Sequence, residues 1–93
     1  MPDDEQAKTK AIEGFSSTIA RDPNNAEAYF NRGRLYDSRG DLEKAIADYT
    51  KAIELKPDHA EAYVQRGAVY AEKGEPGKAA SDYQKYRSLS GSK

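Results

Sequence analysis

The stretch AEAYFNRGRLYDSRGDLEKAIADYTKAIELKPDH, residues 26–59, aligns without gaps on AEAYVQRGAVYAEKGEPGKAASDYQKYRSLSGSK, residues 60–93. Fourteen of the 34 aligned positions hold the same residue. Residues 10–23 align in the same register on residues 44–57, with Phe15 where Tyr49 stands. A fixed period of this length is typical of repeat proteins, in which each unit stacks on the next. We therefore predict one domain over residues 1–93, built from a half unit at 6–23 and full units at 26–59 and 60–93.

The composition excludes several classes of protein. Fifteen Lys and Arg against sixteen Asp and Glu give a formal net charge of −1, so no basic surface for nucleic acid is expected. No apolar run approaches the roughly 18 residues of a membrane span, and residues 1–6 lack the pattern of a signal peptide. Membrane insertion is therefore not expected, and cytoplasmic localisation is. With no Cys and a single His, disulfides, metal sites and cofactors are not expected either.

Each full unit is predicted to form two helices joined by a glycine turn. Asn24 and Asp58 each stand three residues before a Glu, an arrangement in which the polar side chain caps a helix start. The first helix carries one stripe at helical spacing, namely Tyr29, Gly33 and Tyr36. Helices are expected to end at Pro23, Gly40, Pro57 and Gly74. A helix over about residues 6–21 precedes these two pairs, which gives an all-α fold of five helices.

The residues at these spacings resemble the tetratricopeptide repeat, a 34-residue helix-turn-helix. The matching series is Tyr29, Gly33, Tyr36, Ala45, Tyr49, Ala52 and Pro57. The last unit keeps the first five of these positions and departs at Tyr86 and Gly91. The resemblance implies antiparallel helix pairs stacked in a right-handed superhelical solenoid.

In this family the first helix of each pair lines a concave groove, so the resemblance also implies a binding surface. The predicted groove residues are Glu27, Phe30, Asn31, Arg34, Asp37, Glu61, Val64, Gln65 and Ala68. Their spacing places each helix's set on one face. The two units differ at these positions except at Glu27 and Glu61, whereas the packing stripe repeats. Such a contrast is expected of a binding surface on a common scaffold.

Phe30 has two interpretations at this stage. As a groove residue it would anchor an apolar side chain of a peptide, flanked by Arg34 and the two glutamates. As a packing residue it would close over the adjoining half-repeat helix.

Some tetratricopeptide domains hold the C-terminal carboxylates of chaperone tails in a clamp of Lys, Asn, Asn, Lys and Arg. Asn31 matches one Asn of that clamp, but Glu61 and Gln65 stand at the later Lys and Arg positions. Glu61 would repel a carboxylate, so we do not expect this clamp here.

The other polar residues indicate no catalytic group. Arg32 and Arg66 stand just before the glycine of each unit, where the family often has Leu. Each is expected either to be exposed or to snorkel, with its stem packed over a neighbouring helix, or else to contact a phosphate or carboxylate. His59 is expected to be an exposed turn residue. Lys44 and Asp48, like the pair 78 and 82, are spaced to form helix-supporting pairs on exposed faces.

The sequence therefore predicts a non-catalytic scaffold or adaptor that binds a protein or peptide in its concave groove. The alternative is a self-association module that forms homo-oligomers through terminal helices left without a capping partner.

Overall fold

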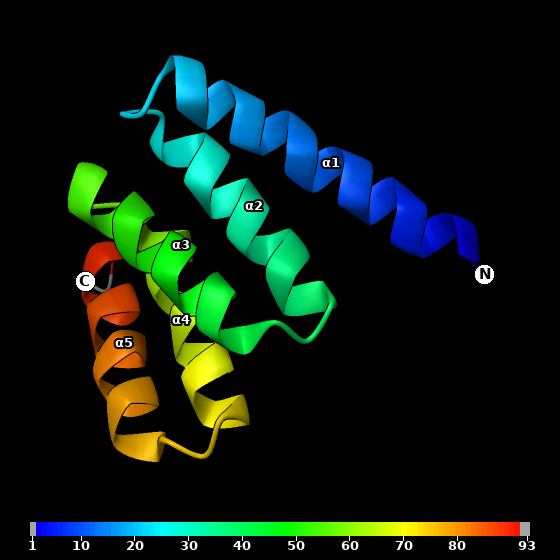
Figure 1. Cartoon of the computed structure of the whole chain (residues 1–93). Coiled ribbons are helices and arrows are strands. Elements are labelled where there is room, and N and C mark those ends of the chain that lie inside the picture. The colour runs from blue at the N-terminus through cyan, green and yellow to red at the C-terminus, as the bar shows by residue number, and fades with distance from the viewer. Residues whose placement is uncertain (1, 92–93) are drawn as a thin grey trace.

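The computed structural model describes residues 2–91, and these form five α-helices joined by short turns (Figure 1). The helices are α1 (Pro2–Arg21), α2 (Ala26–Ser38), α3 (Leu42–Leu55), α4 (Ala60–Glu72) and α5 (Pro76–Leu89). The prediction of an all-α chain of five helices is confirmed. The first helix is longer than expected, because it begins at Pro2 rather than near Gln6.

The turns follow from the residues that end and begin each helix. Gly40 and Gly74 have φ angles of 81° and 82°, a left-handed conformation that glycine adopts without steric cost. The helix starts lie one residue later than the capping pattern predicted. Asn25, not Asn24, caps α2 by accepting a hydrogen bond from the Ala28 amide at 3.0 Å. His59, not Asp58, precedes α4 and makes no side-chain cap bond.

Neighbouring helices pack as antiparallel pairs, α2 with α3 and α4 with α5, while α1 packs on α2 and α3 on α4 (Figure 1). The fit within a pair rests on a glycine. A Cβ atom on Gly33 would lie 2.9 Å from Cε1 of Tyr49, and one on Gly67 would lie 2.8 Å from Cε1 of Tyr83. The small residue thus lets an aromatic ring lie directly on the helix backbone. The core is accordingly thin, with Ala45, Tyr49, Ala52, Ala62 and Val69 all 0% exposed.

Arg32 and Arg66 each join three successive helices. The Arg32 guanidinium donates to both carboxylate oxygens of Asp48 on α3 at 2.8 Å and to Ser16 Oγ on α1 at 3.0 Å. Arg66 repeats these contacts with Asp82 on α5 and Thr50 on α3. Each guanidinium also lies 5.7–5.9 Å from the centroids of two tyrosine rings of its own helix.

The carboxylate partner of each arginine is therefore internal, and the interpretation of these residues as ligand contacts is wrong. The hydrogen bonds to Asp48 and Asp82 raise the pKa of both guanidinium groups above its usual value. Asp48 and Asp82 are each 5% exposed, so they do not form the exposed pairs with Lys44 and Lys78 that the sequence predicted. Those lysines lie instead 5.4 Å from tyrosine ring centroids.

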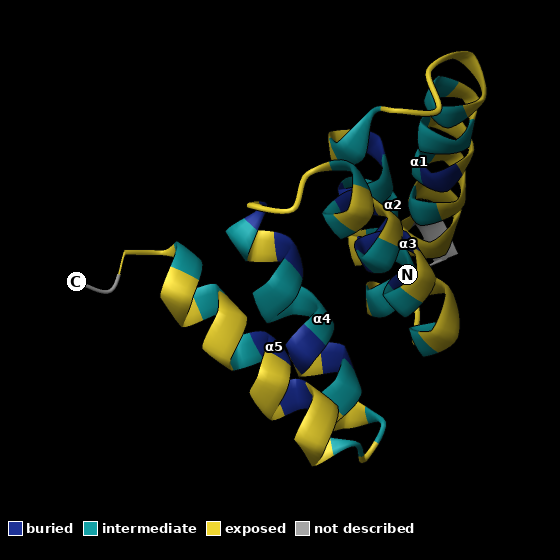
Figure 2. Cartoon of the chain, turned by 90° about the vertical axis from the view of Figure 1, so that its left-hand side faces the viewer, coloured by how far each residue is buried: buried dark blue, intermediate teal, exposed yellow. Residues whose placement is uncertain are grey.

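The residues through which α3 packs on the next helix pair have exposed equivalents on α5. On α3, Thr50 accepts a hydrogen bond from Arg66 of α4, and Ile46 and Ile53 are partly buried and pack against the core. The same positions one repeat later are Ala80, Gln84 and Arg87, all exposed. Much of α5 is exposed, as Figure 2 shows. The outer side of α5 is therefore suited to water rather than to another apolar helix.

No helix within residues 2–91 combines the length and the apolar character that crossing a membrane would need.

Candidate functional site

The candidate site lies on the surface formed by α2 and α4. Among the described residues the backbones of these two helices approach each other closely, whereas those of α1, α3 and α5 do not. The first helices of the pairs therefore converge and the second helices spread apart, so the α2–α4 surface lies on the inside of the curve. All nine predicted groove residues lie on these two helices.

The structure leaves most of the predicted groove residues accessible. Glu27, Arg34, Glu61 and Ala68 are exposed, and four more are half-buried, namely Asn31, Asp37, Val64 and Gln65. The remaining residue, Phe30, is the exception.

Phe30 is 4% exposed, and its prediction as a groove anchor is corrected. Its ring lies 5.8 Å from that of Tyr49 and 4.7 Å from that of His59, measured between centroids. It packs on Tyr49 of α3 and on His59 in the turn before α4. The equivalent Val64 is half-buried, so the two units differ here in packing.

His59 is a packing residue as well, and its prediction as an exposed turn residue is wrong. The side chain is 8% exposed beneath Phe30, and Nε2 lies 3.5 Å from Oε2 of the exposed Glu27. That separation does not amount to a hydrogen bond, because Nε2 has no hydrogen-bond partner within the described structure.

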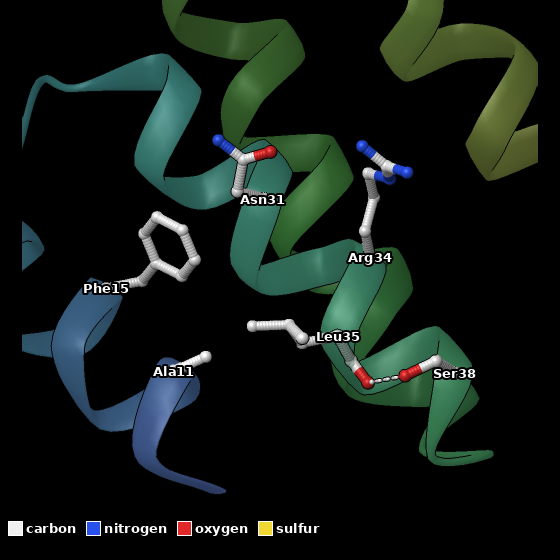
Figure 3. Close-up of a pocket in the computed structure, with 6 residues that line it drawn as sticks. All are labelled: Ala11, Phe15, Asn31, Arg34, Leu35 and Ser38. Atoms are coloured by element: carbon white, nitrogen blue, oxygen red, sulfur yellow. Dashed lines mark hydrogen bonds between the residues drawn. The ribbon is translucent and has the colours of Figure 1, made fainter. Parts of the chain in front are cut away.

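A cavity of about 340 Å³ opens between α1 and α2 (Figure 3). It is lined by Ala11, Phe15, Asn31, Arg34, Leu35 and Ser38. Leu35 points from α2 towards Ala11 and Phe15 on α1, while Arg34 extends from α2 away from α1 and forms the rim (Figure 3). The Ser38 hydroxyl is bonded within its own helix, because it donates to the Leu35 carbonyl at 2.8 Å.

The sequence analysis did not assign Ala11, Phe15, Leu35 or Ser38 to a binding site. The alignment of Phe15 with Tyr49 was the available signal, because it gives Phe15 the position of a ring that packs between helices in the full unit.

The charges on this surface are partly balanced. Arg34 forms no ion pair among residues 4–91, and its guanidinium lies 5.9 Å from the centroid of the Phe30 ring. Burial raises the pKa of Asp37, and the nearby Glu72 of α4 raises it further. The surface therefore presents an available cation beside a carboxylate that is held at some cost in its charged form.

The described residues contain no group of three or more His, Cys, Asp or Glu side chains that could hold a metal ion.

The stacked helix pairs and the surface of their first helices define a helical-repeat protein. The comparisons make that class specific. Three sequence models of the tetratricopeptide repeat family match the chain, over residues 15–47, 33–74 and 60–91. The chain belongs to the tetratricopeptide repeat family, as its 34-residue period predicted.

Solved structures agree with this assignment. A crystal structure of MamA is similar at 34% identity and a TM-score of 0.89, over 90% of this chain and 49% of that one. MamA from Desulfovibrio magneticus RS-1 is similar at 26% identity and a TM-score of 0.86, over 94% and 49%. The second tetratricopeptide domain of Spaghetti (RPAP3), bound to the HSP90 peptide SRMEEVD, is similar at 30% identity and a TM-score of 0.87, over 92% and 80%.

The chain thus spans about half the length of the MamA structures. No protein of curated function matches it.

Proposed function

We propose that this chain is a non-catalytic scaffold or adaptor that binds a protein or peptide on the surface of α2 and α4. The observation that carries the proposal is the accessibility of Arg34, a cation that lines the cavity and forms no ion pair with residues 4–91. The two units differ on this surface at the exposed position of Arg34 against Ala68 and at the half-buried position of Asn31 against Gln65. A surface of this kind can select a partner with mixed polar and apolar side chains.

The RPAP3 domain supports the proposal in its general form, because that domain is bound to a peptide. We do not extend the same peptide to this chain. Glu61 is exposed at a position where the carboxylate clamp of the family has a Lys, and Gln65 replaces an Arg. We therefore propose a ligand recognised near Arg34 at the α1 end of the surface.

Self-association is the alternative function, and one observation weighs against its C-terminal form. The exposed residues on the outer side of α5, Ala80, Gln84 and Arg87, offer little apolar area for a second copy.

Affinity capture with matched variants tests the proposal. One variant carries Arg34→Glu and Gln65→Glu, and the control carries Lys51→Glu and Gln84→Glu, which change the charge equally on the second helices. Proteins that bind the inner surface should be lost with the first variant and kept with the control. Equal recovery with both variants would contradict the proposal, and circular dichroism verifies that both variants fold.

A further inference from the structure

The repeat provides a template for the cavity between α1 and α2. Shifted by 34 positions, its lining residues become Ala45, Tyr49, Gln65, Ala68, Val69 and Glu72. These residues lie on α3 and α4, and α2 packs against both helices. The cavity is therefore the position, one repeat earlier, that α2 occupies in the full unit.

Burial shows the difference between the filled and the open position. Under α2, Ala45, Tyr49 and Val69 are each 0% exposed. Their equivalents in the cavity, Ala11, Phe15 and Leu35, are only partly buried. The lining residues of the cavity therefore correspond to residues that a helix covers one repeat later. A helix in the cavity would extend the row formed by α2 and α4 by one helix.

The way α2 fits its position indicates what kind of helix the cavity accepts. Gly33 of α2 lies against the ring of Tyr49, where a Cβ atom would come within 2.9 Å of Cε1. Phe15 presents the same ring without the hydroxyl group. A helix seated on Phe15 therefore needs a Gly or Ala at the corresponding place.

Three residues differ between the cavity and the equivalent site under α2, and they indicate which charges the bound helix would carry. Gly14 stands where Asp48 binds Arg32, so an arginine before the small residue would have no carboxylate partner. Ser38 stands where Glu72 faces Asp37, so an acidic residue at the place of Asp37 would meet no like charge. Arg34 stands where Ala68 does and adds a cation at the rim, one helical turn from Ser38.

We propose that the cavity between α1 and α2 binds an amphipathic α-helix of a partner protein, with a Gly or Ala over Phe15 and an acidic residue beside Arg34 and Ser38. The bound helix would lie against α1 and α2 as α2 lies against α3 and α4. This assignment rests on the proposed binding function and gives it a ligand class, a helix rather than an extended tail.

A synthetic peptide of residues 24–40 with Arg32→Ala serves as the probe, because its sequence copies α2. The arginine is replaced because Gly14, unlike Asp48, has no carboxylate to bind it. The full chain, labelled with ¹⁵N, is titrated with this peptide, and amide shifts are followed. The expected shifts centre on Ala11, Phe15 and Leu35. Binding is expected to be weak, because a 17-residue peptide of this kind is marginally helical alone.

Two altered peptides test the specificity. Gly33→Leu in the peptide should weaken binding by at least about tenfold, because a large side chain collides with Phe15. Asp37→Lys should weaken it by about threefold or more, because the cation then faces Arg34. In the chain, Ala11→Glu should abolish the shifts, whereas Ala7→Glu on the exposed side of α1 should keep them.

Four results would overturn the proposal. The first two are the absence of shifts at millimolar peptide and equal binding of the Gly33→Leu peptide. The third is a set of shifts centred on Tyr49, which would report displacement of α2. The fourth is a set of concentration-dependent shifts at the cavity without peptide, which would assign the cavity to a second copy of the chain. The proposed binding function stands separately, because it falls only if the capture experiment finds no dependence on Arg34 and Gln65.

Discussion

Arg32 and Asp48 form a two-pronged pair in which Nε and Nη2 each donate to a carboxylate oxygen at 2.8 Å. The side chains are 20% and 7% exposed, so both charged groups are largely removed from water. The same geometry recurs between Arg66 and Asp82. This pair gives each unit a directional contact in a thin core made largely of small, aliphatic and aromatic residues.

Removing one partner of that pair should destabilise the fold. We expect Asp48→Ala to lower the free energy of unfolding by about 2–3 kcal/mol, somewhat less than for a fully buried pair, because the remaining guanidinium is still partly exposed. Lys44→Ala, one turn earlier on α3, should cost less than about 0.5 kcal/mol. Urea denaturation measures both. Similar losses in the two variants would show that the pair has no special part in stability.

Glycine substitutions should have opposite signs at two positions. Gly33→Ala should destabilise by about 1–3 kcal/mol, because the added Cβ meets the Tyr49 ring at 2.9 Å. Gly14→Ala should stabilise by about 0.5–1 kcal/mol, because alanine favours a helix interior and the new Cβ meets no atom within 4 Å. Thermal denaturation of both variants provides the measurement. Stabilisation by Gly33→Ala would contradict the close packing.

Much of the fold follows from the 34-residue period, because the glycines, prolines and aromatic stripe mark helices and turns locally. The sequence also contained an indication of the Arg–Asp pairs, because Arg32 and Asp48 recur one period later as Arg66 and Asp82. That signal was misread because a lysine stood four residues before each aspartate in the sequence. Which cation reaches the carboxylate depends on how the two helices are set against each other, and this is a tertiary property.

The burial of Phe30 was not predictable in the same way. Its equivalent is Val64, and a difference between units is what a variable groove position also shows. The decisive contacts come from Tyr49 on α3 and from His59 in the turn before α4. The path of that turn places His59 beneath the ring, and no local pattern near residue 30 indicates it.

Truncating the two equivalent residues should therefore have unequal costs. Phe30→Ala should destabilise by about 3 kcal/mol, because it removes a buried ring and leaves a cavity beside Tyr49. Val64→Ala should cost about 1 kcal/mol, because its side chain is only half-buried. Denaturant titration compares the two losses. A smaller loss for Phe30→Ala than for Val64→Ala would contradict the buried position of the ring.

The hydroxyl of Tyr49 should contribute little to stability. It is buried without a hydrogen-bond partner within the described structure, and burial raises its pKa. Tyr49→Phe removes an unpaired polar group and should change the free energy of unfolding by between zero and about +1 kcal/mol. Tyr83→Phe, at the half-buried equivalent position, should leave it within about 0.5 kcal/mol. A loss above 1 kcal/mol for Tyr49→Phe would show that a partner binds the hydroxyl.

Asp37 should give the stability a pH dependence of definite sign. Burial and Glu72 raise its pKa above the ordinary value of 3.8, so the native state binds this proton more tightly than the unfolded state does. Stability is then lowered by this group at neutral pH, and the penalty disappears as the pH falls through the raised pKa towards 3.8. Asp37→Asn should therefore stabilise at pH 7 by a few tenths of a kcal/mol, about 1–3 °C in Tm, and by nothing at about pH 3.

A double-mutant cycle with Glu72→Gln separates the two causes of this effect. If the carboxylates repel each other, Asp37→Asn should stabilise less when Glu72 is already neutral. The part of the gain that remains measures the cost of burying Asp37. Equal gains in both backgrounds would show that Glu72 does not act on Asp37. Asp37 also lies on the proposed binding surface, so a ligand with a cation near Asp37 would favour its charged form. Asp37→Asn would then raise the Tm of the protein without ligand and lower the Tm of the complex.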